Sequence, residues 1–171
     1  MDGNLKINEY GNTGPSTPKV FVVKEDGTYR ETSIKLLPRI PNLTYDMGGG
    51  ETNYYPEKNI VIVDNIPVKE FAKNPGEIKG EKVYVEYNLN IPISLPKANK
   101  IIVSQVVYHL DNVKNFSQTL NSSLNKGGEV NFWTDLEDNK KDTLFLQYMK
   151  EYGFSISNEE DRGWKSIILK K

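Results

Sequence analysis

Three consecutive glycines and an aspartate behind an apolar run are the residues of this chain best suited to chemistry. Gly48, Gly49 and Gly50 follow one another directly. Such a run accepts positive φ and leaves its N–H groups uncovered, so a carboxylate or a phosphate can approach them. Asp64 follows the apolar run 60–63, and an acid at the carboxyl end of a parallel strand can bond ribose hydroxyls. The alternative is a plain glycine turn followed by an acidic turn residue.

The composition indicates one folded domain and excludes several kinds of site. The 171 residues are 37% hydrophobic and 26% charged, with a formal net charge of -1. This length allows one sizeable core, and the charge provides no global basic field for duplex nucleic acid. The absence of cysteine excludes a thiolate nucleophile, and a single histidine, His109, argues against a metal site. No apolar run reaches membrane-spanning length and no signal-peptide core is present, so a cytoplasmic location is the default expectation.

The elements that would hold these residues alternate between strands and helices. Alternation favours a mostly parallel sheet, and a short turn before the last strand makes that strand antiparallel to its predecessor. Phe132, Trp133 and Phe145 are predicted to lie in the core. After a short strand that begins near residue 43, strands are predicted at 60–63, 82–87, 100–107, 129–135, 154–157 and 164–169, and helices at 68–73, 113–125 and 139–152.

The amino-terminal part is predicted to be organised differently from the rest. Residues 1–42 are expected to form an arm and a β-hairpin, and residues 43–171 an α/β domain. The hairpin prediction rests on a strand at 19–23 and an Asp-Gly turn. Residues 33–37 would continue the returning strand or form a helical turn. The predicted fold class is therefore Rossmann-like: a doubly wound, mostly parallel sheet with an antiparallel C-terminal strand, preceded by the arm and hairpin.

Four segments appear in an order typical of one enzyme family. They are Tyr45–Gly50, with the three glycines; Val61–Asp64, with the strand-end acid; Tyr87–Ile93; and Ile101–Leu110. Together they resemble the class I S-adenosylmethionine-dependent methyltransferases over residues 43–171. The likeness is greatest to compact members that lack the first crossover helix, because only a short loop separates Gly50 from the second strand.

The resemblance implies a methyltransferase that uses S-adenosylmethionine as its cofactor. The three glycines would bind the aminocarboxyl end of the cofactor and Asp64 the ribose, while Asp46 would orient the loop or bond the amine. His109 is the candidate general base because its unperturbed pKa lies near neutrality; the alternative is a histidine that packs against the next helix. The other residues implied are Asn88 and Leu89 beside the adenine, Ser104 and Gln105 below the methyl group, and Tyr54, Tyr55 and Tyr108 around the acceptor.

Two departures from the family pattern keep other functions open. Asn88 stands where the family has an acid, and Tyr108 stands where a glutamate precedes the histidine. A catalytically degenerate module that retains the fold and binds a partner is the first alternative. The second is a C-terminal effector or toxin domain of a larger secreted or injected protein, because the residues after Met1 do not resemble a natural start. The methyl acceptor stays open among small molecules, proteins and RNA, and so does the oligomeric state.

Overall fold

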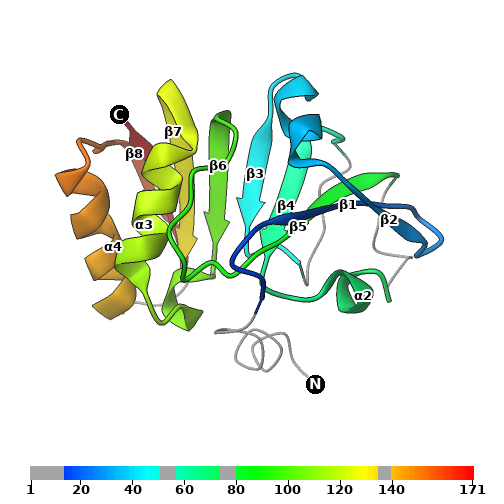
Figure 1. Ribbon diagram of the computed structural model, residues 1–171. Helices are drawn as coiled ribbons and strands as arrows, with labels where there is room; N and C mark the ends of the chain where they lie inside the picture. Colours follow the sequence, from blue (N-terminus) through cyan, green and yellow to red (C-terminus); the bar gives the residue numbers. More distant parts are fainter. Residues whose placement is uncertain (1–13, 51–56, 74–79, 135–139) are drawn as a thin grey trace.

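Nine strands join in one mixed sheet within the residues that the computed structural model describes, which are 14–50, 57–73, 80–134 and 140–171 (Figure 1). The strands are β1 Lys19–Val23, β2 Tyr29–Thr32, β3 Thr44–Met47, β4 Ile60–Asp64, β5 Lys82–Glu86, β6 Ala98–Ser104, β7 Leu124–Thr134, β8 Ser155–Asp161 and β9 Lys165–Lys170. Their order across the sheet is β2-β1-β5-β4-β3-β6-β7-β9-β8. The five central strands, β5 to β7, are parallel, and antiparallel pairs flank them on both sides. This confirms the predicted mostly parallel α/β sheet with an antiparallel strand near the C-terminus.

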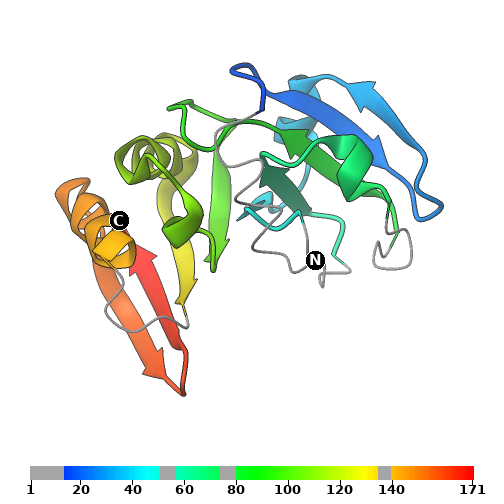
Figure 2. The same cartoon turned by 90° about the horizontal axis from the view of Figure 1, so that it is seen from below.

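The two longest described helices cover the same face of the sheet (Figure 2). The described helices are η1 Ile34–Arg39, α2 Val68–Phe71, η3 Val107–His109, α3 Val113–Ser122 and α4 Lys140–Glu151. Asn112 caps α3, because its side chain accepts a hydrogen bond of 2.9 Å from the backbone N–H of Asn115. None of the described helices is long and apolar enough to cross a membrane.

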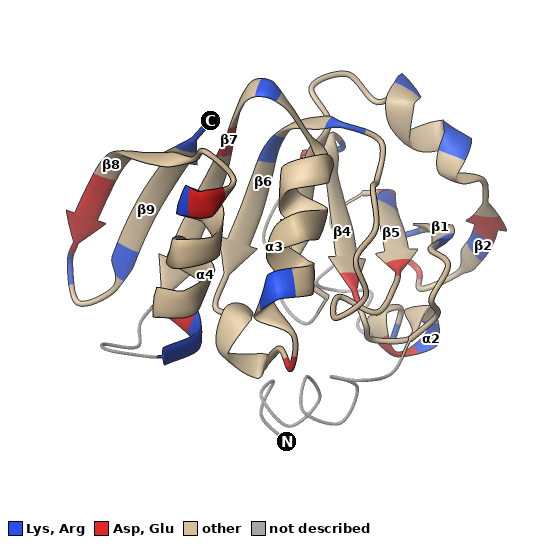
Figure 3. Ribbon diagram, turned by 60° about the vertical axis from the view of Figure 1, so that its left-hand side comes forward, with Lys and Arg blue, Asp and Glu red and all other residues tan. Residues whose placement is uncertain are grey.

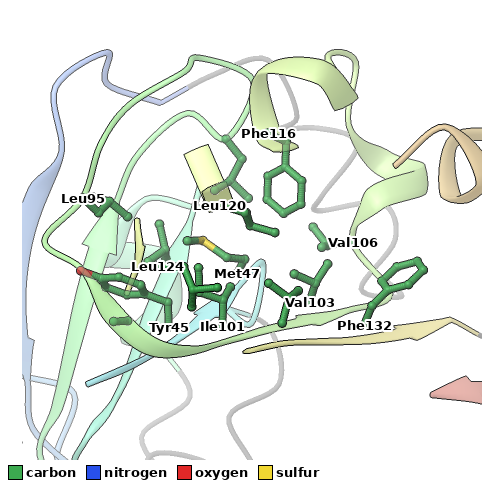
Figure 4. Packing of buried hydrophobic residues seen from close by; sticks show 14 of the residues in the cluster. Tyr45, Met47, Leu95, Ile101, Val103, Val106, Phe116, Leu120, Leu124 and Phe132 are labelled. Carbon is green, nitrogen blue, oxygen red and sulfur yellow. The ribbon is translucent and has the colours of Figure 1, made fainter. Parts of the chain in front are cut away.

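The main core lies between the sheet and helices α3 and α4. Side chains alternate along a strand, so Tyr45 and Met47 point from β3 to this covered face. Phe116 and Leu120 of α3 lie over Met47 and the neighbouring strands (Figure 4). Phe145 of α4 packs with ring-centroid distances of 5.9 Å to Phe116 and 4.9 Å to Phe132. The prediction that Phe132 and Phe145 lie in the core is confirmed.

The opposite face is covered much less evenly by the described residues. Short helix α2 packs Phe71 on Tyr84 of β5, with the rings stacked at 4.3 Å. No described helix covers this face over β6, β7 and β9. Trp133 on β7 is therefore 40% exposed, and the prediction that it lies in the core is wrong. Alternation along β7 sends Phe132 into the core and Trp133 to the open face.

Several predicted boundaries shift in the structure. Of the two forms expected for residues 33–37, the helical turn forms, and it continues to Arg39. The helix predicted to reach residue 125 ends at Ser122, and strand β7 begins at Leu124 and runs through Gly127 and Gly128. Residues 158–161, predicted to lie in the short turn before the last strand, belong to β8, which pairs with β9. Strand pairing across the sheet overrides the local turn composition in both places.

The amino-terminal hairpin is continuous with the central sheet. Strand β1 pairs antiparallel with both β2 and β5, so it extends the parallel strands at one side. Residues 1–13 of the predicted arm lie outside the described part of the chain, as do Tyr54 and Tyr55. The division of the chain at residue 42 stays a prediction.

Candidate functional site

The glycine run and the acid predicted to work with it meet at one edge of the sheet. Strands β3 and β4 are parallel neighbours, with Asp46 level with Ile62. Gly48 follows the end of β3, and Asp64 is the last residue of β4. Figure 3 shows the acidic ends of β4 and β5 at the same edge. The fold therefore gathers both carboxylates and the glycines at the carboxyl ends of parallel strands, where α/β sheets bind ligands.

Each of the three glycines makes room for a different side chain of the protein itself. Gly48 has a φ of +80°, and a Cβ on it would lie 2.4 Å from a methyl carbon of Val106. A Cβ on Gly49 would lie 2.0 Å from a carboxylate oxygen of Asp46. On Gly50 it would lie 2.8 Å from a carboxylate oxygen of Asp64. The run thus brings the backbone against both acids, and the N–H of Gly48 donates to the carbonyl of Val63 at 2.7 Å.

Asp64 is tied directly to the glycine bend. The backbone N–H of Gly50 donates to one carboxylate oxygen at 2.8 Å, and the N–H of Ile66 donates to the other at 3.3 Å. The side chain is 3% exposed. Burial raises the pKa of Asp64 above its ordinary value, while these N–H donors act to lower it. Sequence reasoning predicted that this acid and the bend share a location, and the structure brings them together.

Asp46 lies beside Asp64 in a buried cluster of charged groups. Burial raises the pKa of Asp46 to about 7, and the charge of Asp64 adds to the rise. The ammonium of Lys82 acts in the opposite direction. Lys82 is itself buried, and its Nζ donates to the backbone carbonyl of Glu57 at 2.7 Å. The site therefore holds one acid whose charge changes near neutral pH.

The two residues predicted to contact adenine, Asn88 and Leu89, are hydrogen-bonded to other parts of the chain. The N–H of Asn88 donates to the carbonyl of Pro15 at 3.2 Å, and the N–H of Leu89 donates to the side chain of Asn65 at 3.2 Å. A Cβ on Gly14 would lie 3.2 Å from the Asn88 nitrogen. The segment just before β1 thus lies against the residues predicted to contact adenine, and a ligand there would have to displace or share these bonds.

The residues predicted to lie near the methyl group follow strand β6. Ser104 ends β6, and Gln105 has a φ of +53° and donates its N–H to the carbonyl of Trp133 at 3.0 Å. His109 ends the short helix η3, with its ring 4.1 Å from that of Tyr108. Burial, and then the charge of Lys141, lower the pKa of His109. The imidazole is therefore neutral at neutral pH, as a general base must be.

Sequence reasoning missed three residues at or near the site. Asn65, Lys82 and the exposed Trp133 were given no role there. Asn65 directly follows the strand-end acid, so its position was a usable signal. The burial of Lys82 had no signal of its own, because lysine at the start of a strand is usually solvated.

Comparisons with known proteins find the same fold. No family model and no curated protein matches the sequence. Among solved structures, a TehB-like SAM-dependent methyltransferase from Corynebacterium glutamicum matches over 81% of this chain and 86% of its own, with 15% identity and a TM-score of 0.59. The N-methyltransferase NodS from Bradyrhizobium japonicum, in complex with S-adenosyl-L-homocysteine, matches over 80% and 84%, with 10% identity and a TM-score of 0.57.

A third similar structure is a mutant of the 16S rRNA (adenine(1408)-N(1))-methyltransferase from Catenulisporales acidiphilia. It matches over 88% of this chain and 96% of its own, with 11% identity and a TM-score of 0.59. The chain has the class I methyltransferase fold. The match supports the family resemblance at the level of the fold, and a shared fold does not identify an acceptor.

Proposed function

We propose that this protein binds S-adenosylmethionine at the edge formed by β3 and β4 and transfers its methyl group to an acceptor. The observation that carries the proposal is the hydrogen bond from the Gly50 N–H to Asp64, beside the buried Asp46. It joins the glycine bend and the strand-end acid into one site. The shared fold of solved methyltransferases supports the same function.

The chemistry of the buried acids fits the cofactor. An ionised carboxylate accepts hydrogen bonds through about four lone-pair sites, and the backbone N–H groups of Gly50, Ile66 and Asn65 act on Asp64. Its remaining sites suit ribose hydroxyls, which donate. Asp46 would bond the amine or orient the glycine loop. When bound, the cofactor supplies an electrophilic methyl group on sulfur, and the protein's main task is to align the acceptor with that group.

His109 is the group best placed to take a proton from the acceptor. It ends η3, the short helix that follows β6, and its lowered pKa keeps it neutral. Tyr108 packs on its ring and would border the acceptor. If His109 acts as the base, His109→Ala should lower kcat while leaving the affinity for the cofactor unchanged.

Calorimetric titration with S-adenosylhomocysteine tests the proposal without requiring an acceptor. The protein should bind this product, and Asp64→Asn should weaken binding by roughly 1–3 kcal/mol because a bond to a charged acceptor is lost. Glu159→Gln, an exposed acid on the edge strand β8, is the matched control and should bind as the parent does. Equal affinity in Asp64→Asn and the parent would remove Asp64 from the ribose role.

A second candidate is a binding module that retains the fold without the cofactor. The bonds from the N–H groups of Asn88 and Leu89 to Pro15 and Asn65 favour it, because the adenine end already has partners. Absence of heat with S-adenosylmethionine at millimolar concentration would select this candidate over the enzyme.

A further inference from the structure

A pair of stacked tryptophans stands on the open face of the sheet. The rings of Trp133 and Trp164 lie 4.8 Å apart with an interplanar angle of 7°. Trp133 belongs to β7, and Trp164 immediately precedes β9, which is paired with β7. The two side chains are 40% and 36% exposed. More than a third of the surface of each of these two large aromatic residues is thus left in solvent.

The tryptophan pair lies on the same face and near the same edge as the buried acids. Trp133 is level with Ser104 on β6, and Ser104 follows Val103, which is level with Met47 on β3. Gly48 follows Met47, so the glycine bend, Ser104 and Trp133 form one row across three strands. With about 4.8 Å between neighbouring strands, Trp133 stands roughly 10 Å from the bend. This is a short step beyond the predicted position of the methyl group.

We infer that the exposed indole pair is an acceptor subsite that stacks a planar heteroaromatic ring of the nucleobase type. The inference rests on the proposed function, because the row from Gly48 to Trp133 links the pair to the methyl donor. A flat aromatic platform that keeps open ring surface attracts another flat ring by offset stacking. Cross-strand packing alone would account for the contact between the two indoles, but it does not explain why both remain exposed to solvent.

The charged groups next to the pair do not favour a phosphate, so the ring itself is the group that the pair would recognise. Lys165 follows Trp164 in the chain, and the backbone N–H of Arg162 donates to the carbonyl of Trp164 at 3.1 Å. Against these two bases stand three acids of β8, Glu159, Glu160 and Asp161, and Glu160 lies 3.8 Å from the Arg162 guanidinium. A free nucleotide and an exposed base in single-stranded RNA both present such a ring, and the titration below separates them.

Intrinsic fluorescence reports on the subsite alone, because the chain has two tryptophans and both belong to it. The full-length protein, with and without saturating S-adenosylhomocysteine, is titrated with adenosine monophosphate, with a short single-stranded RNA and with ribose 5-phosphate, which lacks the ring. We expect saturable quenching by at least one of the two ring-bearing probes and none by ribose 5-phosphate. Tighter binding of the RNA than of the nucleotide would identify a polynucleotide as the source of the ring.

Variants decide whether the indoles themselves bind the ring. Trp133→Ala retains Trp164 as reporter and should weaken binding of the ring-bearing probe by about tenfold or more, while Trp133→Phe restores most of the affinity. Tyr29→Ala, at an exposed aromatic residue on the distant strand β2, should bind as the parent does. Equal affinity in Trp133→Ala and the parent, or the absence of quenching by both ring-bearing probes, overturns the inference.

Calorimetry keeps this result separate from the proposed function. Binding of S-adenosylhomocysteine without any ring binding would leave the methyl donor site in place and overturn the acceptor subsite. Ring binding without binding of S-adenosylhomocysteine would support the stacking subsite and overturn methyl transfer.

Discussion

The two faces of the central sheet are made by the same strands but differ in role: one is the apolar core and the other holds the polar residues of the candidate site. On β3, Tyr45 and Met47 point to the face covered by α3 and α4, and both are fully buried among apolar side chains. Thr44 and Asp46 point to the other face, where the neighbouring strands contribute Asp64 and Ser104. The covered face supplies most of the apolar burial, and the opposite face carries the chemistry.

Because the apolar core lies on one face of the sheet, the protein can bury a destabilising carboxylate on the other face. Burying a carboxylate such as Asp46 costs free energy, because the charged form loses its hydration. The apolar packing on the covered face offsets that cost. Substitutions on the covered face should therefore mainly change stability, and those on the opposite face should mainly change binding and pH dependence.

The largest effect is expected on the covered face. Phe145→Ala should lower the free energy of unfolding by about 3–5 kcal/mol, since a fully buried ring between Phe116 and Phe132 is lost and leaves a cavity. The measurement is urea denaturation. Leu144→Ala, on the same helix but 37% exposed, is the control and should cost less than about 1 kcal/mol. Similar losses in the two variants would contradict the assignment of the core to this face.

The next effect concerns the acid on the opposite face. The pKa of Asp46 rises from 3.8 to about 7 on folding, so the folded state holds a proton that the unfolded state has lost. The contribution of Asp46 to stability is therefore fully present below pH 3.8 and is lost as the pH rises towards 7. At 1.36 kcal/mol per pKa unit, the loss reaches roughly 4 kcal/mol.

Asp46→Asn should flatten the stability profile between about pH 4 and pH 7 and should be more stable than the parent at pH 8. Urea denaturation at a series of pH values measures this. Asp64 and Lys82 face the same cluster and are present in both proteins, so the difference between the profiles isolates Asp46. Parallel profiles would show that Asp46 is ionised in the folded protein.

A smaller loss of stability shows whether Gly48 is required for its positive φ or for its close contact with Val106. Gly48 and Gly80 have nearly equal φ values, +80° and +76°, but a Cβ on Gly80 would meet nothing within 4 Å. Gly80→Ala should cost about 1–2 kcal/mol through backbone strain alone. Gly48→Ala adds a collision with Val106, which should cost roughly 1–3 kcal/mol more and weaken binding of S-adenosylhomocysteine. Equal losses would mean that conformation, rather than contact, requires Gly48.

The smallest effect concerns the single histidine. Lys141→Ala should raise the pKa of His109, because a nearby positive charge is removed. The rise should be modest, since burial is the larger cause of the lowered pKa and would persist. Proton NMR resolves this residue without ambiguity, as the chain has one histidine. Lys140→Ala is the matched control at the neighbouring position, and an equal change in both variants would assign the effect to overall charge.

The sequence predicted most elements but failed where distant segments meet. The apolar run before Asp64 and the helical spacing around Phe116 gave the correct element types, because both patterns follow from the period of one strand or helix. The placement of Trp133 was wrong, since its neighbour Phe132 has an equally apolar side chain and only the covering helices distinguish the two faces. The predicted start of β7 was also wrong. The strand begins at Leu124, which pairs with β6, and so includes two glycines of a kind that usually end a helix.

By itself, the sequence determined the order of the strands and helices, the glycine run and the acid that ends the second parallel strand. These features are local, because side-chain period and glycine conformation are set within a few residues. Only the tertiary structure decided that Gly50 bonds Asp64, that Lys82 is buried near Asp46, and that the two tryptophans stack in the open. Each of these depends on strands that are distant in the chain and become neighbours only when the sheet forms.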